Sequence, residues 1–155
     1  MEIKIIEGDL LDSKTDLIVH QVNCRGKMNS GVAKAIREKW PIVFEKYKQL
    51  CDAKGQKIGM CQPVSISDMQ KVINMFSQYD YGYDGKMYTS YDAVNECFEK
   101  IKTYMELKGL KSLSIPYNMC CCRGGANWAV IMELLKANFE KTDFLIEIYK
   151  LEVEK

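Results

Sequence analysis

The segment PYNMCCCRGGANW, residues 116–128, places three consecutive cysteines directly before Arg123 and two glycines. A cysteine thiolate can act as a nucleophile, and a helix N-terminus or the nearby guanidinium of Arg123 could activate it. A nucleophilic cysteine also needs an oriented base, and the sequence shows no partner for Cys121. The alternative is that these small, adaptable side chains fill space behind the loop. We favour the space-filling role.

The cysteine pattern argues against both a disulfide framework and a metal site. The seven cysteines are an odd number without C-x-x-C pairs, and three are adjacent, where neighbouring side chains diverge and cannot readily bridge. Cys120, Cys121 and Cys122 are too crowded to form a tetrahedral zinc site, and only one histidine accompanies them. We therefore expect free thiols in a reducing, cytoplasmic compartment, with no bound metal and no cofactor.

The single histidine, His20, lies in the apolar run DLIVHQVN, residues 16–23. An imidazole titrates near neutrality and could serve as a general acid or base. The interior of a strand is mostly packing, so a satisfied core histidine is the alternative. From its place in the strand we favour the core role, with the general acid or base as the alternative.

Two glycine-containing segments could bind an anion. One is NCRGKMNSGVA, residues 23–33, and the other is the loop after residue 116; each leads into a helical pattern. Backbone amides at such a junction can point at an anion, and the helix dipole assists. Two loops of this kind could hold one ligand with two phosphates. Glycine at strand ends also serves the turn itself, so the glycines alone are weak evidence.

Around these residues, the hydrophobic pattern predicts strands that alternate with helices. The predicted strands are residues 2–9, 16–23, 60–66, 71–78, 113–116 and 144–151. The predicted helices are residues 30–40, 42–53, 91–109 and 128–141, with Ser30 as an N-cap and Gly109 as a C-terminal stop. Residues 79–90, rich in Gly, Asp and Tyr, are predicted to form an exposed loop. This alternation indicates an α/β domain with a mostly parallel or mixed sheet, in which ligands bind at the carboxyl ends of the strands.

Length and charge narrow the class of protein. A chain of 155 residues is the size of one domain, residues 1–155, with a single core. Lys and Arg total 22 against 21 Asp and Glu, so no basic field suggests nucleic-acid binding through phosphate charge. No window approaches the ~20 apolar residues of a membrane span, and the N-terminus lacks an apolar signal segment. We expect a cytoplasmic monomer without nucleic-acid or membrane partners.

Several segments in this order resemble one known family. EGDLLDSKTDLIVHQVNCRGKMNSGVAKAIREKWP resembles the opening of a macrodomain, in which a strand ending in Gly-Asp precedes a second strand and a G-x-M-x-x-G-[VI]-A loop. VINMFSQYDYG, TSYDA and IPYNMCCCRGGANW are similar to small phage and bacterial macrodomains grouped with ADP-ribose-1''-phosphate processing proteins. The resemblance covers essentially the whole chain. It implies a three-layer α/β/α fold with a mixed, mostly parallel central sheet, an ADP-ribose cleft, and a host-cytoplasm location if the protein is phage-encoded.

The resemblance also implies roles for individual residues. Asp9 corresponds to the aspartate that binds the adenine amino group, a task suited to a carboxylate, although Asp9 could instead cap a turn. Asn23 corresponds to the asparagine at the distal ribose, and with His20 it forms the expected catalytic pair. The full set of implied ligand-binding residues is Asp9, Leu10, Asn23, Gly26, Ser30, Gly31, Val32, Ala33, Phe76, Tyr117, Asn118, Met119, Cys120, Cys121, Cys122, Arg123 and Gly124.

Three departures from the family pattern affect the phosphate loops. Cys120 and Cys122 stand where relatives usually have glycine, on either side of the family-typical Cys121, and Asn29 replaces another glycine. Side chains at these positions could weaken phosphate binding or reshape the pocket for another ligand. Phe76 and Tyr117 are either walls of the pocket or core residues, whereas Trp128 is expected to pack.

Three functions remain in competition. The first is a hydrolase that removes a 1''-phosphate or cleaves an ADP-ribosyl linkage, with positioning and electrostatics as the source of catalysis. The second is a non-catalytic binder or sponge for ADP-ribose or a related NAD-derived nucleotide. The third is an interaction module without a nucleotide ligand. Gln78 stands near the point where some glycohydrolase relatives use a lysine, which disfavours chemistry through a lysine adduct.

Overall fold

A six-stranded sheet forms the middle layer of the protein, in a computed structural model that describes residues 1–82 and 84–151. The strand order is β1-β6-β5-β2-β4-β3. The strands are β1 (Glu2–Glu7), β2 (Leu17–Val22), β3 (Cys61–Ser65), β4 (Lys71–Phe76), β5 (Ser112–Pro116) and β6 (Leu145–Lys150). All neighbours pair in parallel except β3 and β4, which are antiparallel.

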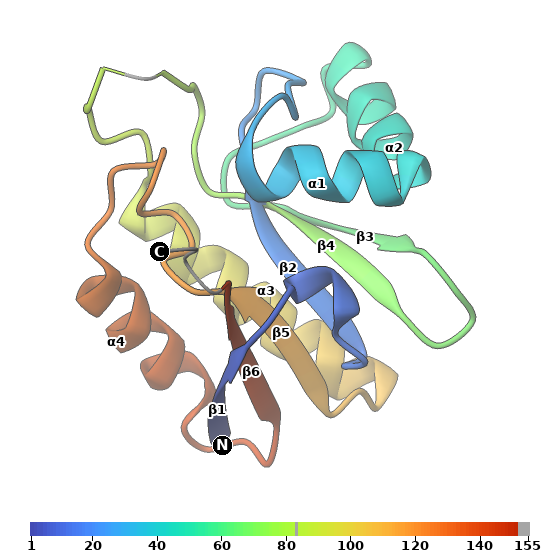
Figure 1. Ribbon diagram of the computed structural model, residues 1–155, viewed down its shortest axis with the longest axis vertical. Helices are drawn as coiled ribbons and strands as arrows, with labels where there is room; N and C mark the ends of the chain where they lie inside the picture. Colours follow the sequence, from blue (N-terminus) through green and yellow to red (C-terminus); the bar gives the residue numbers. More distant parts are fainter. Residues whose placement is uncertain (83, 152–155) are drawn as a thin grey trace.

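Helices cover both faces of the sheet (Figure 1). The helices are η1 (Leu10–Asp12), α1 (Gly31–Lys39), α2 (Pro41–Asp52), α3 (Tyr91–Lys108) and α4 (Trp128–Phe139). Helices α1 and α2 pack on one face through a core that includes Ile36, Val43 and Tyr47. Helices α3 and α4 pack on the other face through a core that includes Phe98 and Phe139. The predicted three-layer α/β/α fold with a mixed, mostly parallel sheet is confirmed.

Local sequence signals set the ends of several helices. Helix α3 begins after Ser90, whose side chain accepts a hydrogen bond from the amide of Ala93, and ends at Gly109 with φ 68°. A left-handed residue at this position favours glycine. Ser30 precedes α1 as predicted, but its side chain makes no capping hydrogen bond. The chain enters α2 at Pro41, because proline is tolerated in the first turn of a helix.

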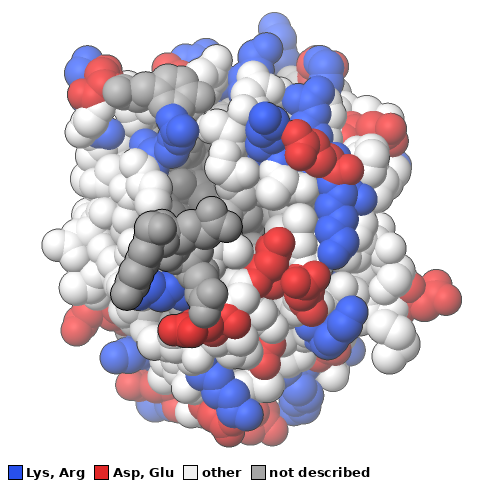
Figure 2. Space-filling view, viewed as in Figure 1, with Lys and Arg blue, Asp and Glu red and all other residues white. Residues whose placement is uncertain are grey.

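Charged side chains of both signs lie on the face of the protein drawn in Figure 2. Blue and red side chains are intermixed over the face shown in Figure 2. Among the described helices, none combines the length and apolar character that a bilayer crossing needs.

Candidate functional site

A cavity of about 400 Å³ lies at the carboxyl edge of the sheet. Strands β2, β4 and β5 are adjacent and parallel, so the loops that follow them gather at one end of the molecule (Figure 1). All three loops contribute lining residues. The predicted residues that line the cavity are His20, Asn23, Ser30, Gly31, Val32, Ala33, Tyr117, Asn118, Met119, Cys120, Cys122, Arg123 and Gly124.

The charged groups of the lining are cationic. Lys27 and Arg123 line the cavity, and no Asp or Glu does so among the described residues. The first turn of α1 also contributes Gly31, Val32 and Ala33 to the lining. Two cations and the amino end of a nine-residue helix favour an anionic ligand.

Asn23 is held by hydrogen bonds within its own loop. Its Oδ1 accepts from the amide of Arg25 at 2.9 Å and from the hydroxyl of Tyr47 at 2.8 Å, and its Nδ2 donates to the carbonyl of Lys27 at 3.0 Å. The Tyr47 hydroxyl lies 2.7 Å from the Asn23 carbonyl and accepts from the Lys27 amide at 3.1 Å. The buried Tyr47 therefore fixes the shape of the loop that follows β2, through its hydrogen bonds to Asn23 and Lys27.

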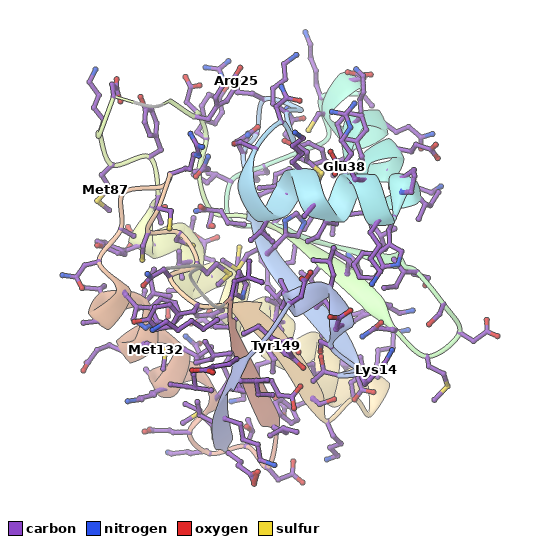
Figure 3. All side chains as sticks on the ribbon, in the orientation of Figure 1. Lys14, Arg25, Glu38, Met87, Met132 and Tyr149 are labelled. Carbon is purple, nitrogen blue, oxygen red and sulfur yellow. The ribbon has the colours of Figure 1, made fainter. Side chains whose placement is uncertain are left out.

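A second set of contacts joins this loop to the loop that follows β4. The amide of Cys24 donates to the Tyr79 carbonyl at 3.0 Å. Arg25, labelled at the upper end of the molecule in Figure 3, lies 4.7 Å from the centre of the Tyr79 ring and 3.2 Å from Asp80. Two neighbouring walls of the cavity are thus held together, because Tyr81 follows directly and lines the cavity.

His20 is a buried, neutral imidazole in the central strand β2. Its Nε2 lies 2.6 Å from Oδ1 of Asn74 on β4, and its Nδ1 has no hydrogen-bond partner among the described residues. Burial lowers the pKa of His20 from 6.5 to about 4, and the hydrogen bond with Asn74 opposes part of that shift. A neutral imidazole can accept a hydrogen bond or a proton at physiological pH, whereas the acidic imidazolium is scarcely populated.

Two glutamines add polar groups to the cavity. Gln21 Nε2 donates to Ser77 Oγ at 2.8 Å and to Thr89 Oγ1 at 3.0 Å, which occupies its donors. Gln78 is buried, lines the cavity, and its Oε1 has no partner within the described parts of the chain. Buried acceptors without partners are costly to the fold, so His20 and Gln78 suit a ligand that brings hydrogen-bond donors, such as hydroxyl groups.

The three consecutive cysteines differ in environment. Cys120 has φ 72° and is buried, with its thiol 3.8 Å from Ser77 Oγ, whereas Cys122 is exposed. The backbone at 120 thus takes the conformation that favours glycine, which explains why a glycine is typical there. Burial raises the pKa of Cys120 to about 12 and that of Cys121 to about 11. Both remain thiols at neutral pH, which disfavours nucleophilic catalysis.

Gly124 closes this loop against the rest of the site. Its carbonyl accepts from the amides of Tyr88 and Thr89 at 2.8 and 2.9 Å. A Cβ at this position would collide with Thr89 Oγ1 and the Cys120 carbonyl oxygen. Glycine is therefore required for the loops that follow β4 and β5 to meet.

Five of the predicted ligand-binding residues do not line the cavity: Asp9, Leu10, Gly26, Phe76 and Cys121. Asp9 is exposed and caps η1, with Oδ1 accepting from the amide of Leu11 at 2.9 Å, which is the turn-capping alternative considered for it. Phe76 is a core residue whose ring centre lies 5.7 Å from that of Tyr47. Tyr117 does line the cavity, and its ring centre lies 5.2 Å from that of Trp128.

Other lining residues were not in the predicted set: Gln21, Val22, Lys27, Met28, Asn29, Gln78, Tyr81, Gly82 and Pro116. Lys27, Met28 and Asn29 lie inside a loop that the sequence singled out. Gln78 ends the predicted strand of residues 71–78, and Tyr81 and Gly82 lie in the predicted exposed loop of residues 79–90. Only the parallel pairing of β4 with β2 brings that loop to the cavity.

A family model and two curated relatives match this chain. The model of the Macro domain family matches residues 19–133. A curated relative, the DNA ADP-ribosyl glycohydrolase of Mycobacterium tuberculosis, is 26% identical over 137 residues, which are 86% of this chain and 38% of the relative. The ADP-ribose 1''-phosphate phosphatase of Aspergillus oryzae is 38% identical over 50 residues, 32% of this chain and 25% of the relative. This chain thus spans less than half the length of either relative.

A solved structure shows the same fold. Thermosipho africanus DarTG in complex with ADP-ribose superposes with a TM-score of 0.81 at 20% identity, over 99% of this chain and 42% of that chain.

Proposed function

Because this chain belongs to the macrodomain family, we propose that its cavity binds ADP-ribose or an ADP-ribose derivative and hydrolyses the derivative at the distal ribose. The observation that carries the proposal is the composition of the cavity lining. Two cations and the amino end of α1 lie at the cavity, no described carboxylate lines it, and two buried acceptors lack partners. A diphosphate flanked by ribose hydroxyls fits this lining. Its phosphates can accept hydrogen bonds from the cations and the helix end, and its hydroxyls can donate to the two buried acceptors.

Strand order gives the ligand a direction. The loops after β5 and β2 are neighbours and supply both cations together with Gly31 and Gly124, whereas Gln78 follows β4 on the far side of β2. We place the diphosphate between the first two loops and the distal ribose toward β4. In this arrangement His20, Asn23 and Gln78 lie at the sugar end of the ligand.

The proposed chemistry is hydrolysis by water rather than by a protein nucleophile. Water attacks at the bond that joins the distal ribose to its substituent; this bond breaks, one fragment keeps the hydroxyl of the water, and the other fragment leaves. Neutral His20 is the group able to accept the water proton. The raised pKa values of Cys120 and Cys121 leave them protonated, and Gln78 offers no amine. Catalysis would then depend on positioning and on charge stabilisation by the loops, which is consistent with slow turnover. The relatives named as a glycohydrolase and a phosphatase support this reaction class.

A second candidate function is a non-catalytic binder of the same ligand. The observation in its favour is that His20 is the only imidazole and no carboxylate lines the cavity within the described residues, so the cavity offers neither an imidazolium nor a carboxyl group as a general acid. A binder needs the same anion-binding loops but no proton transfer.

Calorimetric titration with ADP-ribose is the first test. We expect saturable 1:1 binding, and Lys27→Gln should weaken it about fivefold, the scale of one exposed charge-assisted contact. Lys34→Gln is the matched control, because Lys34 lies on α1, pairs with Glu38 and does not line the cavity. Absence of binding by the folded protein would refute the proposal and favour an interaction module.

A second test separates the enzyme from the binder. Phosphate release from ADP-ribose-1''-phosphate and release of ADP-ribose from an ADP-ribosylated substrate should be measured at saturating enzyme. Turnover in either assay that His20→Ala abolishes supports the hydrolase. Tight binding with no release in both assays supports the sponge.

A further inference from the structure

A directional chain of hydrogen bonds leads from the backbone of α2 to His20. Gln62 Nε2 donates to the Lys46 carbonyl at 3.0 Å, and Asn74 Nδ2 donates to Gln62 Oε1 at 3.1 Å. His20 Nε2 completes the chain at 2.6 Å from Asn74 Oδ1. The three side chains come from β3, β4 and β2, and the chain ends on a helix of a different layer.

The end of the chain sets the direction of every bond in it. A backbone carbonyl can only accept, so Gln62 must turn its amide nitrogen toward Lys46 and its oxygen toward Asn74. Asn74 must then donate to Gln62, which leaves its oxygen facing His20. That oxygen also can only accept, so the proton of the neutral imidazole must lie on Nε2.

The other ring nitrogen is left as a bare acceptor. Nδ1 of His20 is buried without a partner among the described residues, and His20 lines the cavity. An apolar side chain at this position of β2 would avoid an unpaired buried acceptor, so packing alone does not explain the histidine. A donor supplied from the cavity, by a ligand hydroxyl or a water, does explain it.

We propose that Asn74 and Gln62 are positioning residues that hold His20 as the Nε2–H tautomer, so that Nδ1 accepts a hydrogen bond from a hydroxyl group or water bound in the cavity. The identity of the hydroxyl as a ribose hydroxyl rests on the proposed function. The tautomer does not, because it is a property of the free protein.

The test uses the fact that the protein has one histidine. Long-range ¹H–¹⁵N NMR of the uniformly labelled protein near pH 7 distinguishes a protonated ring nitrogen from a bare one. We expect a single species with Nε2 protonated and Nδ1 bare, and a shift of the Nδ1 resonance when ADP-ribose is added to saturation. A majority Nδ1–H tautomer, or a fast mixture of both, overturns the inference.

Variants of the two positioning residues separate this role from a structural one. Asn74→Leu or Gln62→Leu should convert the single tautomer into a mixture, and a half-populated competent form would weaken ADP-ribose binding about twofold. His20→Leu, which removes the acceptor altogether, should weaken binding more. Asn95→Ala on α3 removes a half-buried asparagine outside the cavity and should change neither the tautomer nor the affinity. Gln62 lies at the edge of the sheet, so Gln62→Leu keeps the test available if Asn74→Leu fails to fold.

The outcomes distinguish this inference from the proposed function. If calorimetry shows ADP-ribose binding while the Nδ1 resonance stays unchanged, the acceptor role is wrong. An unchanged tautomer in both folded Leu variants removes the positioning role. If ADP-ribose does not bind at all, the proposed function fails, and the spectrum of the free protein still decides whether the chain sets the tautomer.

Discussion

Acidification should destabilise the protein through His20 by an amount that the structure allows us to work out. The pKa of His20 is lowered from 6.5 to about 4 in the folded state by burial. Between these values the unfolded chain binds a proton that the folded chain excludes, so the free energy of unfolding falls as the pH falls. Each pKa unit corresponds to about 1.4 kcal/mol, so the full shift amounts to about 3 kcal/mol. The contribution is absent above pH 7 and complete near pH 4.

Carboxylates titrate in the same range, so the measurement needs a matched variant. Urea denaturation at pH 7.5, 6.5, 5.5 and 4.5 should be compared for wild type and His20→Gln, which is polar but does not titrate. We expect the stability difference between the two proteins to shift against the wild type by about 2 to 3 kcal/mol from pH 7.5 to pH 4.5. Parallel pH dependences of the two proteins would show that His20 is not desolvated, and the argument for its neutral state would fail.

Three further predictions concern the loops. The double variant Cys120→Gly with Cys122→Gly should bind ADP-ribose more tightly than wild type, because it removes two side chains from a proposed phosphate loop. Calorimetry under reducing conditions at fixed salt compares the two dissociation constants. Weaker binding by the folded variant would show that the cysteines form part of the pocket. Cys121→Ser should leave any turnover within about twofold of the wild-type rate, because the raised pKa keeps the Cys121 thiol protonated. Loss of turnover with binding retained would identify Cys121 as a nucleophile. Tyr47→Phe should lower the free energy of unfolding by about 1 to 3 kcal/mol, because Asn23 loses a buried hydrogen-bond partner, and it should also weaken ADP-ribose binding. Urea denaturation measures the change in stability, and calorimetry measures the change in affinity. An unchanged affinity would show that the shape of this loop does not affect ligand binding.

The helices and strands could be predicted closely because their signals are local. The apolar spacing of residues 91–109, with Ser90 before it and Gly109 at its end, matches α3 to within a residue. The run DLIVHQVN is buried on both sides, as expected for a central parallel strand. The two glycine-containing loops that the sequence predicts to bind an anion both line the cavity, and a glycine before a helix is visible in the sequence.

The contribution of β4 could not be predicted, because pairing order is not a local property. The sequence shows where β4 lies along the chain, but only the sheet shows that β4 neighbours β2 and carries Gln78 to the cavity. Asp9 shows that a local motif can be compatible with two roles. A Gly-Asp pair after the first strand is compatible with a ligand contact and with a cap, and the structure records the cap.

The sequence by itself determined the α/β class, the position of two glycine-containing loops before helices, and the presence of one histidine and three adjacent cysteines, because composition and short-range periodicity suffice for these. Only the tertiary structure decided what those residues can do. His20 meets Asn74 across 54 residues, and Asn23 meets Tyr47 across 24. The protonation state and the direction of a side chain depend on burial and on such distant partners. The sequence around His20 is therefore compatible with a core histidine, a base or a hydrogen-bond acceptor until the neighbouring strands are placed.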